Sequence, residues 1–380
     1  MRVLIAARAL EAPGGSETYA LTVAEHIARL GHPVTLAGRS LGATAEAARE
    51  QGFDVVGEFA SLDEAPDAVL VQDRTWAIEL AERFPDAVRV FVSHGIDDQL
   101  HLPPPITGAV AASVALNERT ALRLRAFEAA GEVVRMRQPI DLRRFSARGR
   151  LAARPKRALV LGNYLQGPRL EILQEAWEDV ELVRVGMLTA SDLDPSERMT
   201  GMDIVVGYGR SILEAMAAGR PAFVYDHSGA DGWVTPDTYP RLEADGFAGT
   251  QALPMTVASL RDQLDRWDPQ LGSFGQDLIR SEHDARMHAA ELIGLLDRLS
   301  PTRAPAAAPL REMALLAELQ FRAEVTADEQ RMEAHRQALR AQAEAEQAQA
   351  RVDYLLGMRR VKLGATLARP LDAIRRLLRR

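Results

Sequence analysis

The sequence predicts an α/β protein made of two doubly wound units in succession, followed by a helical extension. Three observations carry this prediction. Short apolar runs alternate with helical patterns through the first 140 residues, the alternation restarts after a loop at 146–155, and the stretch 310–354 contains neither Gly nor Pro. Apolar strands spaced by helices are typical of a parallel sheet covered on both faces. Two such units in succession imply a cleft between them. Sheets of this kind bind ligands there, beyond the carboxyl ends of their strands.

The first unit is assigned to residues 1–147. Its expected strands are short apolar runs, at Val3–Ala7, Val34–Gly38, Ala68–Gln72, Val88–Ser93, Ala109–Ala112 and Val133–Met136. Helical patterns between them predict helices over Glu17–Leu30, Thr44–Gln51, Thr75–Phe84 and Asn117–Ala130.

The second unit is assigned to residues 148–299 and repeats this organisation. Its expected strands are Ala158–Leu161, Leu182–Val185, Ile204–Val206 and Ala222–Tyr225. Its expected helices lie near Arg169–Trp177, Ser211–Ala218 and Ser281–Leu299.

The last 81 residues have a different composition. Residues 300–309 (SPTRAPAAAP) form a Pro/Ala linker. Alanines at near 3–4 spacing predict a long helix over 310–354, and this pattern leaves an isolated solvated helix and a coiled-coil homodimer both open. Residues 355–380 set leucines among arginines, which is typical of a basic amphipathic helix on an anionic membrane. A helix packed on the protein or on a partner is the alternative.

Charge is distributed unevenly along the chain. The formal net charge is −7, yet residues 355–380 carry eight Arg or Lys against the single acid Asp372. The acidic body argues against nucleic acid as a partner and confines any polyanion contact to the tail. The first residues do not resemble a signal peptide, and no run approaches the roughly 18 apolar residues of a membrane helix. We therefore expect a cytoplasmic protein that the tail places peripherally at the inner membrane face.

The residue types also exclude several chemistries. The chain has no cysteine, and its only lysines are Lys156 and Lys362. A disulfide framework, a zinc–thiolate site, an iron–sulfur cluster and a thiol nucleophile are therefore excluded. A Walker P-loop is excluded as well, because neither lysine follows Gly or precedes Ser or Thr. Any phosphate clamp must consist of arginine, backbone amides or a helix N-terminus.

Two features of the first unit suggest a ligand site. Gly14 and Gly15 lie between the first strand and the first helix, where paired glycines let a backbone approach a ligand. His94 ends the apolar run VFVSH and is followed by Gly, so it projects into the crevice at the end of its strand. Taken alone, the glycines also fit a tight turn, and His94 also fits a structural role.

The stretch 207–218 (GYGRSILEAMAA) is the most informative part of the second unit. Gly209 and Arg210 follow a strand, and a helix is expected to begin near Ser211. Its N-terminal amides and Arg210 form an anion site suited to a diphosphate. Glu214, one turn further on, can accept two hydroxyl hydrogen bonds from a ribose diol. A glutamate that compensates the helix dipole is the alternative.

These stretches, in this order, resemble retaining GT-B glycosyltransferases of the glycosyltransferase family 4 type. The resemblance covers about residues 1–300 and rests on five stretches. They are 13–17 with 29–34, 90–95, 112–113 with the helix after it, 138–145 (QPIDLRRF) and 207–224 (GYGRSILEAMAAGRPAFV).

The resemblance implies a GT-B fold and the transfer of a sugar from a nucleotide-diphosphate sugar to a hydroxyl of a glycan or lipid-linked acceptor. It implies front-face displacement with retention, no bound cofactor and no metal. It also implies that His94 orients the transferred sugar, that Glu214 holds the ribose, and that the remaining donor-binding positions are Gly14, Gly15, Asn163, Arg169, Gly209, Arg210, Ser211 and Asp231. The helix from Ser281 to Leu299 is expected to pack back on the first unit.

Three positions depart from the family pattern. Val206 stands where the family carries the first Glu of Glu-x7-Glu, and Asn163 and Pro168 stand where it carries Arg and Lys. Arg169 and Arg210 are the available substitutes. These departures keep two alternatives open: a non-catalytic GT-B-like subunit that binds a nucleotide or a partner, and an epimerase-type enzyme of the same fold.

Overall fold

The computed structural model forms two compact units, Met1–Pro309 and Leu310–Arg380. The structure describes residues 1–306 except for 13, 58–61, 63, 97–98, 146–150, 163–164, 166, 186–194, 227–228 and 251–252, and, beyond them, 312–313, 315–317, 319–320, 322–324, 326–327 and 330. The described residues from 312 to 330 are helical, as the sequence predicts for 310–354. The other residues of the predicted helix and the predicted basic tail lie outside the described residues.

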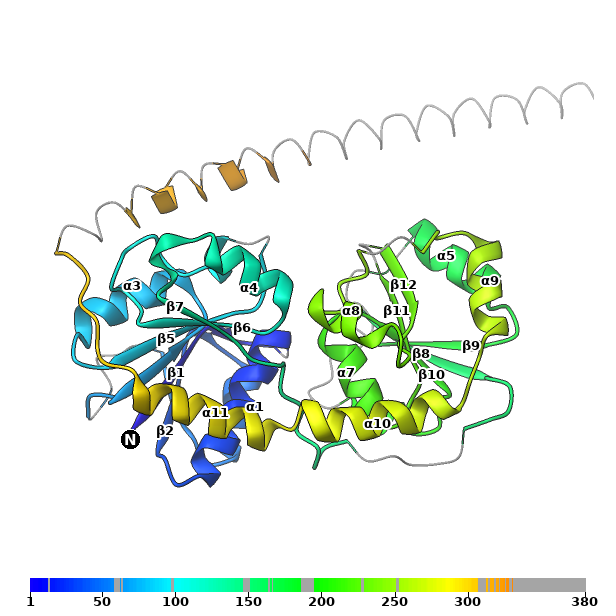
Figure 1. Cartoon of the computed structure of the whole chain (residues 1–380), viewed down its shortest axis with the longest axis horizontal. Helices are drawn as coiled ribbons and strands as arrows, with labels where there is room; N and C mark the ends of the chain where they lie inside the picture. Colours follow the sequence, from blue (N-terminus) through cyan, green and yellow to red (C-terminus); the bar gives the residue numbers. More distant parts are fainter. Residues whose placement is uncertain are drawn as a thin grey trace, which may run out of the picture. The chain divides into compact units, whose positions relative to one another are not determined.

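The first lobe of the larger unit is built on a seven-stranded parallel sheet in the order β3-β2-β1-β4-β5-β6-β7 (Figure 1). Its strands are β1 (Val3–Leu10), β2 (Val34–Leu41), β3 (Asp54–Val56), β4 (Ala68–Val71), β5 (Val88–Ser93), β6 (Ala112–Ala115) and β7 (Glu132–Arg135). Its helices are α1 (Gly15–Arg29), α2 (Ala43–Glu50), α3 (Arg74–Arg83) and α4 (Glu118–Arg125), with short 3-10 turns at Gln99–His101 and Glu128–Ala130.

The second lobe contains a five-stranded sheet in the order β12-β11-β10-β8-β9, in which only β12 is antiparallel to its neighbour among the described strands. The strands are β8 (Arg157–Leu161), β9 (Glu181–Val185), β10 (Ile204–Gly207), β11 (Ala222–Asp226) and β12 (Gly229–Trp233). The helices are α5 (Gly167–Ala176), α6 (Ser196–Met199), α7 (Arg210–Ala217), α8 (Tyr239–Ala244), α9 (Val257–Asp265), α10 (Gln270–Glu282) and α11 (Ala285–Arg298). Two successive doubly wound units are therefore confirmed.

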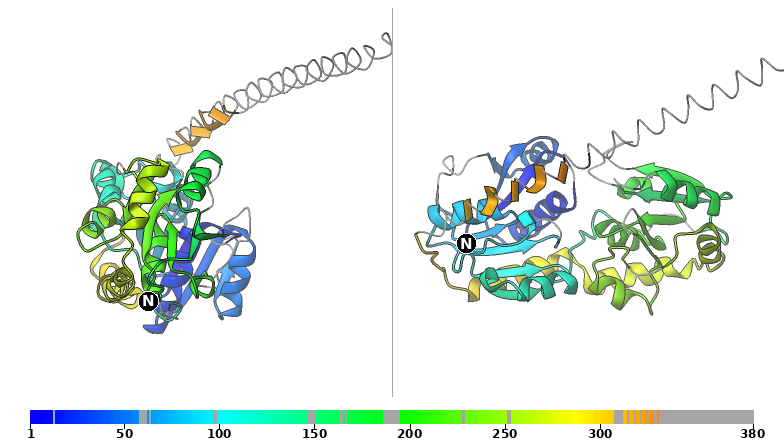
Figure 2. Two further views of the ribbon diagram at one scale, coloured as in Figure 1. Left: turned by 90° about the vertical axis from the view of Figure 1, so that its right-hand side faces the viewer. Right: turned by 90° about the horizontal axis from the view of Figure 1, so that it is seen from above.

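The chain returns to the first lobe through α10 and α11. α10 packs on α7, whereas α11 packs on α1. Figure 1 shows the pair in line along one side of the two lobes, and Figure 2 gives two further views of the same ribbon. Leu292, Leu295 and Leu296 of α11 belong to the apolar core that covers β1. The predicted packing on the first unit is thus confirmed. The single predicted helix over Ser281–Leu299 is wrong, because Asp284 interrupts it and caps α11 by accepting the N–H of Arg286 at 2.9 Å.

The first part of the Pro/Ala linker lies against the first lobe. Arg89, buried at the start of β5, donates to the carbonyl oxygens of Phe84 and Ala109, both at 2.8 Å, and to that of Thr302. Arg303 pairs with Asp86 at 2.7 Å. Residues 302–303 are therefore held on the lobe at the amino end of β5, opposite the edge at which β5 ends in His94.

Candidate active site

Most of the predicted site residues follow the carboxyl ends of parallel strands. Gly14 and Gly15 follow β1, His94 follows β5, and the turn Gly209–Ser211 follows β10. This is the edge at which open parallel sheets bind their ligands. The strand pattern of the sequence is therefore enough to predict that these residues lie at this edge.

The turn between β1 and α1 places backbone amides at the start of a helix without a side-chain cap. Gly14 is the N-cap residue, with extended φ of −143°, and a Cβ at this position would collide with the carboxylate of Glu17. Glu17 accepts a hydrogen bond from Ser16 at 2.9 Å and folds back over the turn. Gly15 has open space around its Cα, because no atom lies within 4 Å of the place that a Cβ would occupy there. Because the Glu17 carboxylate is the movable end of a flexible side chain, packing requires a glycine at neither position.

His94 lies immediately beyond β5, and its neighbour Ser93 fixes the turn that follows. The Ser93 hydroxyl is within hydrogen-bonding distance of two carbonyl oxygens, those of Gly95 at 3.2 Å and His101 at 2.7 Å. The Nε2 atom of His94 is buried and has no partner among the described residues. Burial lowers the pKa of His94 to about 3, and the charges of His101 and Arg210 add to this effect. His94 is therefore a neutral imidazole at physiological pH.

Two buried side chains, Tyr19 and His288, form a cluster with His94, which is itself partly exposed. The Tyr19 ring meets His94 edge-on, with ring centroids 5.0 Å apart, and the Tyr19 hydroxyl hydrogen-bonds Nε2 of His288 at 2.8 Å. Burial raises the pKa of Tyr19 and lowers that of His288 to about 3. Neither residue could be recognised from the sequence, because Tyr19 lies on the apolar face of α1 and His288 is 269 positions away on α11.

The turn between β10 and α7 is held tightly to its own strand. Gly209 has a left-handed φ of +58°, and its N–H donates to the carbonyl of Phe247 at 2.9 Å. The Ser211 hydroxyl accepts from the N–H of Tyr208 at 3.2 Å and donates to the Tyr208 carbonyl at 2.8 Å. Ser211 therefore stabilises the turn, while the helix that begins at Arg210 directs its dipole beyond the strand end.

Arg210 and Glu214 form an ion pair one turn apart on α7. Nε of Arg210 lies 2.8 Å from Oε1 of Glu214, and Nη1 donates to the carbonyl of Pro139 at 2.9 Å. The two side chains are only 9% and 10% exposed. Burial lowers the pKa of Arg210, and the Glu214 carboxylate opposes this change. The predicted contacts of Arg210 with a diphosphate and of Glu214 with a ribose would therefore be made by groups that already bind each other.

Arg210 brings the second lobe to the His94 cluster. Its charge adds to the lowering of the pKa of His94 and opposes the rise that burial causes in the pKa of Tyr19. Its hydrogen bond to Pro139 attaches α7 to the segment that connects the lobes. The charge of Arg210 in one lobe thus acts on an imidazole of the other lobe that has an unpartnered nitrogen.

The remaining predicted residues are more dispersed. Arg169 lies in the first turn of α5, exposed, and its carbonyl accepts the hydroxyl of Tyr225 at 2.7 Å. Asp231 is 9% exposed on β12, the edge strand of the second sheet. Asn163 lies outside the described residues. Val206, where the family carries Glu, is fully buried in an apolar layer with Phe223.

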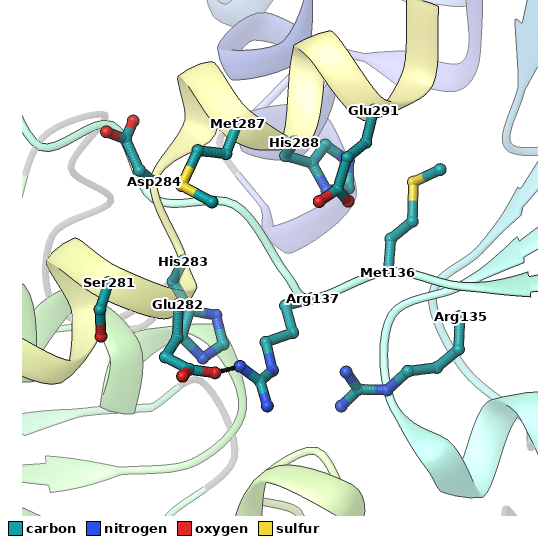
Figure 3. Close-up of a pocket in the computed structure, with 10 residues that line it drawn as sticks. All are labelled: Arg135, Met136, Arg137, Ser281, Glu282, His283, Asp284, Met287, His288 and Glu291. Atoms are coloured by element: carbon teal, nitrogen blue, oxygen red, sulfur yellow. Dashed lines mark ion pairs between the residues drawn. The ribbon is translucent and has the colours of Figure 1, made fainter. Parts of the chain in front are cut away.

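A cavity of about 310 Å³ lies where two segments connect the lobes (Figure 3). Residues 135–137 form one wall, residues 281–284 a second, and α11 a third. Arg137 pairs with Glu282 inside it, and Arg135 pairs with the buried Glu243 of α8. His288 lines this cavity and also contacts Tyr19, so the cavity lies next to the cluster of Tyr19, His94 and His288.

Neither a metal cluster nor a membrane span is found in the part of the chain that the structure describes. No group of three His, Asp or Glu side chains among these residues is arranged to hold a metal ion. No helix among the same residues is both long and apolar enough to cross a membrane.

Comparison with known proteins identifies the fold. No model of a protein family matches the sequence, and a search of the curated proteins gives no match. Among solved structures, a glycosyltransferase from Rickettsia africae has a TM-score of 0.52 at 12% identity, over 78% of this chain and 97% of that one. HepE of Anabaena, solved in complex with UDP-glucose, has a TM-score of 0.51 at 14% identity, over 78% and 100%.

A third structure, sucrose-phosphate synthase from Thermosynechococcus elongatus, has a TM-score of 0.51 at 11% identity, over 78% of this chain and 99% of that one. At such identities the likeness shows the fold. Together with the two doubly wound sheets, it confirms the predicted GT-B architecture.

Proposed function

We propose that this protein is a glycosyltransferase that moves a sugar from a nucleotide-diphosphate sugar to a hydroxyl acceptor. The observation that carries the proposal is the placement of Arg210, at the start of α7 in the second lobe, near enough to the unpartnered His94 of the first lobe for its charge to lower the pKa of that imidazole. A donor bound between them would have its diphosphate beside a cation and a helix N-terminus and its sugar beside the imidazole. The neutral imidazole suits a hydroxyl-rich sugar, because it can accept or donate a hydrogen bond without carrying charge.

In this proposal the second lobe binds the nucleotide. Arg169, Arg210 and the amides that begin α7 at Ser211 hold the diphosphate, while Glu214 holds the ribose. The negative charge that develops on the leaving diphosphate is stabilised by these cations and dipoles, at about 2.7–4 kcal/mol for each well-placed donor. Gly209 supplies the left-handed turn that aims α7, and Asn163 and Asp231 complete the donor site.

The first lobe supplies the sugar and acceptor side. Gly14 and Gly15 let the backbone approach the donor phosphates, and His94 orients the transferred sugar. Reaction on the front face retains the anomeric configuration, with the leaving diphosphate helping to deprotonate the incoming hydroxyl and without a metal. UDP-glucose is the first donor to test, because HepE of Anabaena was solved with it.

In this proposal the C-terminal extension determines where the enzyme lies in the cell. We place the basic tail, 355–380, on an anionic membrane, which would bring the enzyme to a lipid-linked or surface-glycan acceptor. The helix predicted over 310–354 would form a coiled-coil homodimer in this proposal, with an isolated solvated helix as the alternative. Binding of the full-length protein to vesicles containing phosphatidylglycerol, compared with a variant that lacks 355–380, tests the first point. Equal binding by both proteins would reject it.

A panel of sugar nucleotides, each paired with its nucleoside diphosphate, tests the proposed function. We expect one pair to raise the melting temperature, because ligand that binds only the folded state stabilises it by mass action. The same sugar nucleotide should be hydrolysed slowly in the absence of acceptor. Binding without any turnover, with acceptor or without, would instead support a non-catalytic nucleotide-binding subunit, which the apolar environment of Val206 favours. Release of an isomerised sugar would indicate an epimerase.

A further inference from the structure

Gln72 lies at the point where the strand order of the first sheet reverses. It directly follows β4, and its N–H donates to the carbonyl of Ala6 on β1 at 2.9 Å. The order runs from β1 through β2 to β3 on one side and from β4 to β7 on the other. Open α/β sheets bind ligands in the crevice beyond the strand ends at this reversal.

The carboxamide of Gln72 has no partner in the described part of the chain. The residue is 4% exposed, and neither its Oε1 nor its Nε2 makes a hydrogen bond. Buried polar side chains are nearly always paired, because an unmade hydrogen bond leaves the loss of hydration uncompensated. An unpaired amide at the reversal point is therefore more than a packing residue.

Gln72 and His94 face the same side of the sheet. Leu70 on β4 and Val92 on β5 belong to the apolar layer beneath α1. Their neighbours in the sequence, Val71 and Phe91, belong to the layer on the opposite face of the sheet. Side chains alternate along a strand, so Gln72 and His94 both lie on the α1 side. The register pairs Val71 with Phe91, which places Gln72 beside Val92 and one pleat before His94.

Three unpartnered polar atoms of the described residues thus gather at one edge: Oε1 and Nε2 of Gln72 and Nε2 of His94. We propose that Gln72 binds hydroxyl groups of the transferred sugar beside His94 and so helps to select that sugar. A carboxamide has one acceptor and one donor group, which match two neighbouring hydroxyls. This inference rests on the proposed function. A buried group of this kind also rejects a ligand that lacks the matching hydroxyl, because its own hydrogen bond is then left unmade.

The test uses the full-length chain and the variants Gln72→Met, which keeps side-chain length, and Gln72→Leu. Thr44→Val is the matched control, since Thr44 is also fully buried in the first lobe with a hydroxyl that has no partner among the described residues. Affinities for each sugar nucleotide of the panel and for its nucleoside diphosphate are measured by thermal shift. We expect both Gln72 variants to bind the productive sugar nucleotide at least about tenfold more weakly than the wild type, the equivalent of one net hydrogen bond. Binding of the nucleoside diphosphate should not change.

Each other outcome is decisive. If the sugar nucleotide retains its advantage over the diphosphate in both Gln72 variants, the inference is wrong and the proposed function stands. If both variants melt several degrees below the wild type and still prefer the sugar nucleotide, the amide serves the fold. If no sugar nucleotide or diphosphate stabilises even the wild type, the proposed function fails and the inference fails with it.

Discussion

Replacement of Arg210 by methionine is the sharpest test of the candidate site. Arg210→Met removes the cation but keeps most of the apolar stem, so the change is mainly one of charge and hydrogen bonds. In the wild type Arg210 bonds Glu214 and the Pro139 carbonyl, and both members of the ion pair are about nine-tenths buried. The variant leaves Glu214 as an uncompensated carboxylate.

The expected loss of stability is large. Removal of one partner from a buried ion pair lowers the free energy of unfolding by about 3–5 kcal/mol, because the remaining charge is desolvated without compensation. The double variant Arg210→Met/Glu214→Gln leaves no charge behind and should recover about 1–3 kcal/mol of this loss. A matched control is the pair of Arg266 and Asp262, which has the same spacing and the same distance of 2.8 Å but lies exposed. Arg266→Met should cost only about 0.3–0.5 kcal/mol.

Urea unfolding of the four proteins measures these differences. A loss below about 1 kcal/mol for Arg210→Met, similar to that of the exposed control, would refute the buried pair. Because Glu214 is proposed to hold the ribose, the double variant is compared with Glu214→Gln alone to test the function of Arg210 separately from stability. If Arg210 holds the diphosphate, the nucleotide affinity of the double variant falls below that of Glu214→Gln by about 10- to 150-fold, the equivalent of a charged hydrogen bond worth about 1.5–3 kcal/mol. Unchanged nucleotide affinity would restrict Arg210 to a structural role.

Four further predictions concern the surroundings of this pair. Gly15→Ala should leave the melting temperature unchanged, since a Cβ at Gly15 meets no atom within 4 Å, but should weaken nucleotide binding if the backbone there approaches phosphate. Arg169→Gln should behave likewise, because Arg169 is exposed; a fall in stability rather than affinity would contradict its assignment. Tyr19→Phe should lower the free energy of unfolding by about 1–3 kcal/mol, because Nε2 of the buried His288 loses its partner. The same variant should lower kcat more than it changes KM, since Tyr19 supports the His94 ring. Burial lowers the pKa of both His94 and His288 to about 3, whereas these side chains take up protons near pH 6.5 in the unfolded chain. The free energy of unfolding should therefore be highest above about pH 6.5. Toward acid pH it should fall by up to about 1.4 kcal/mol per pH unit for each histidine. The urea midpoint of His288→Gln should vary less steeply with pH between 6.5 and 4 than that of the wild type, and an equal slope would contradict the burial of a neutral His288.

Elements whose pattern is strong and local could be predicted from the sequence. The strand predicted at Val88–Ser93 matches β5 at both ends, and the helix predicted at Thr75–Phe84 differs from α3 by one residue at each end. The strand expected at Ala109–Ala112 is wrong by three residues, since β6 covers Ala112–Ala115. Ala109 instead closes a turn on the carbonyl of Ile106 at 3.0 Å. In a run of alanine and valine the turn and the strand have the same hydrophobic pattern, so tertiary contacts decide the register.

Other parts of the fold give no periodic signal. β12, with the sequence GADGW, contains two glycines and a buried aspartate, yet it pairs with β11 because Trp233 packs edge-on against Phe223. The residue types at strand ends indicated Gly14 and His94 as candidates, and the structure places both beyond the carboxyl ends of strands. The contact of Tyr19 with His288 could not be predicted, because it depends on the return of α11 to the first lobe.

The chain contains only two lysines, and the position of Arg210 shows how arginine could serve a phosphate site in their place. A phosphate site here has to use arginine, and arginine can bind a carboxylate and a phosphate oxygen together because its five N–H groups point in several directions. Arg210 uses Nε for Glu214 and Nη1 for Pro139. A lysine at this position would have to make these contacts and a ligand contact from one ammonium nitrogen, whereas the guanidinium spreads its donors over three nitrogens. Arg210 therefore suits a position at which Glu214, the connecting segment and the proposed diphosphate each require a hydrogen bond.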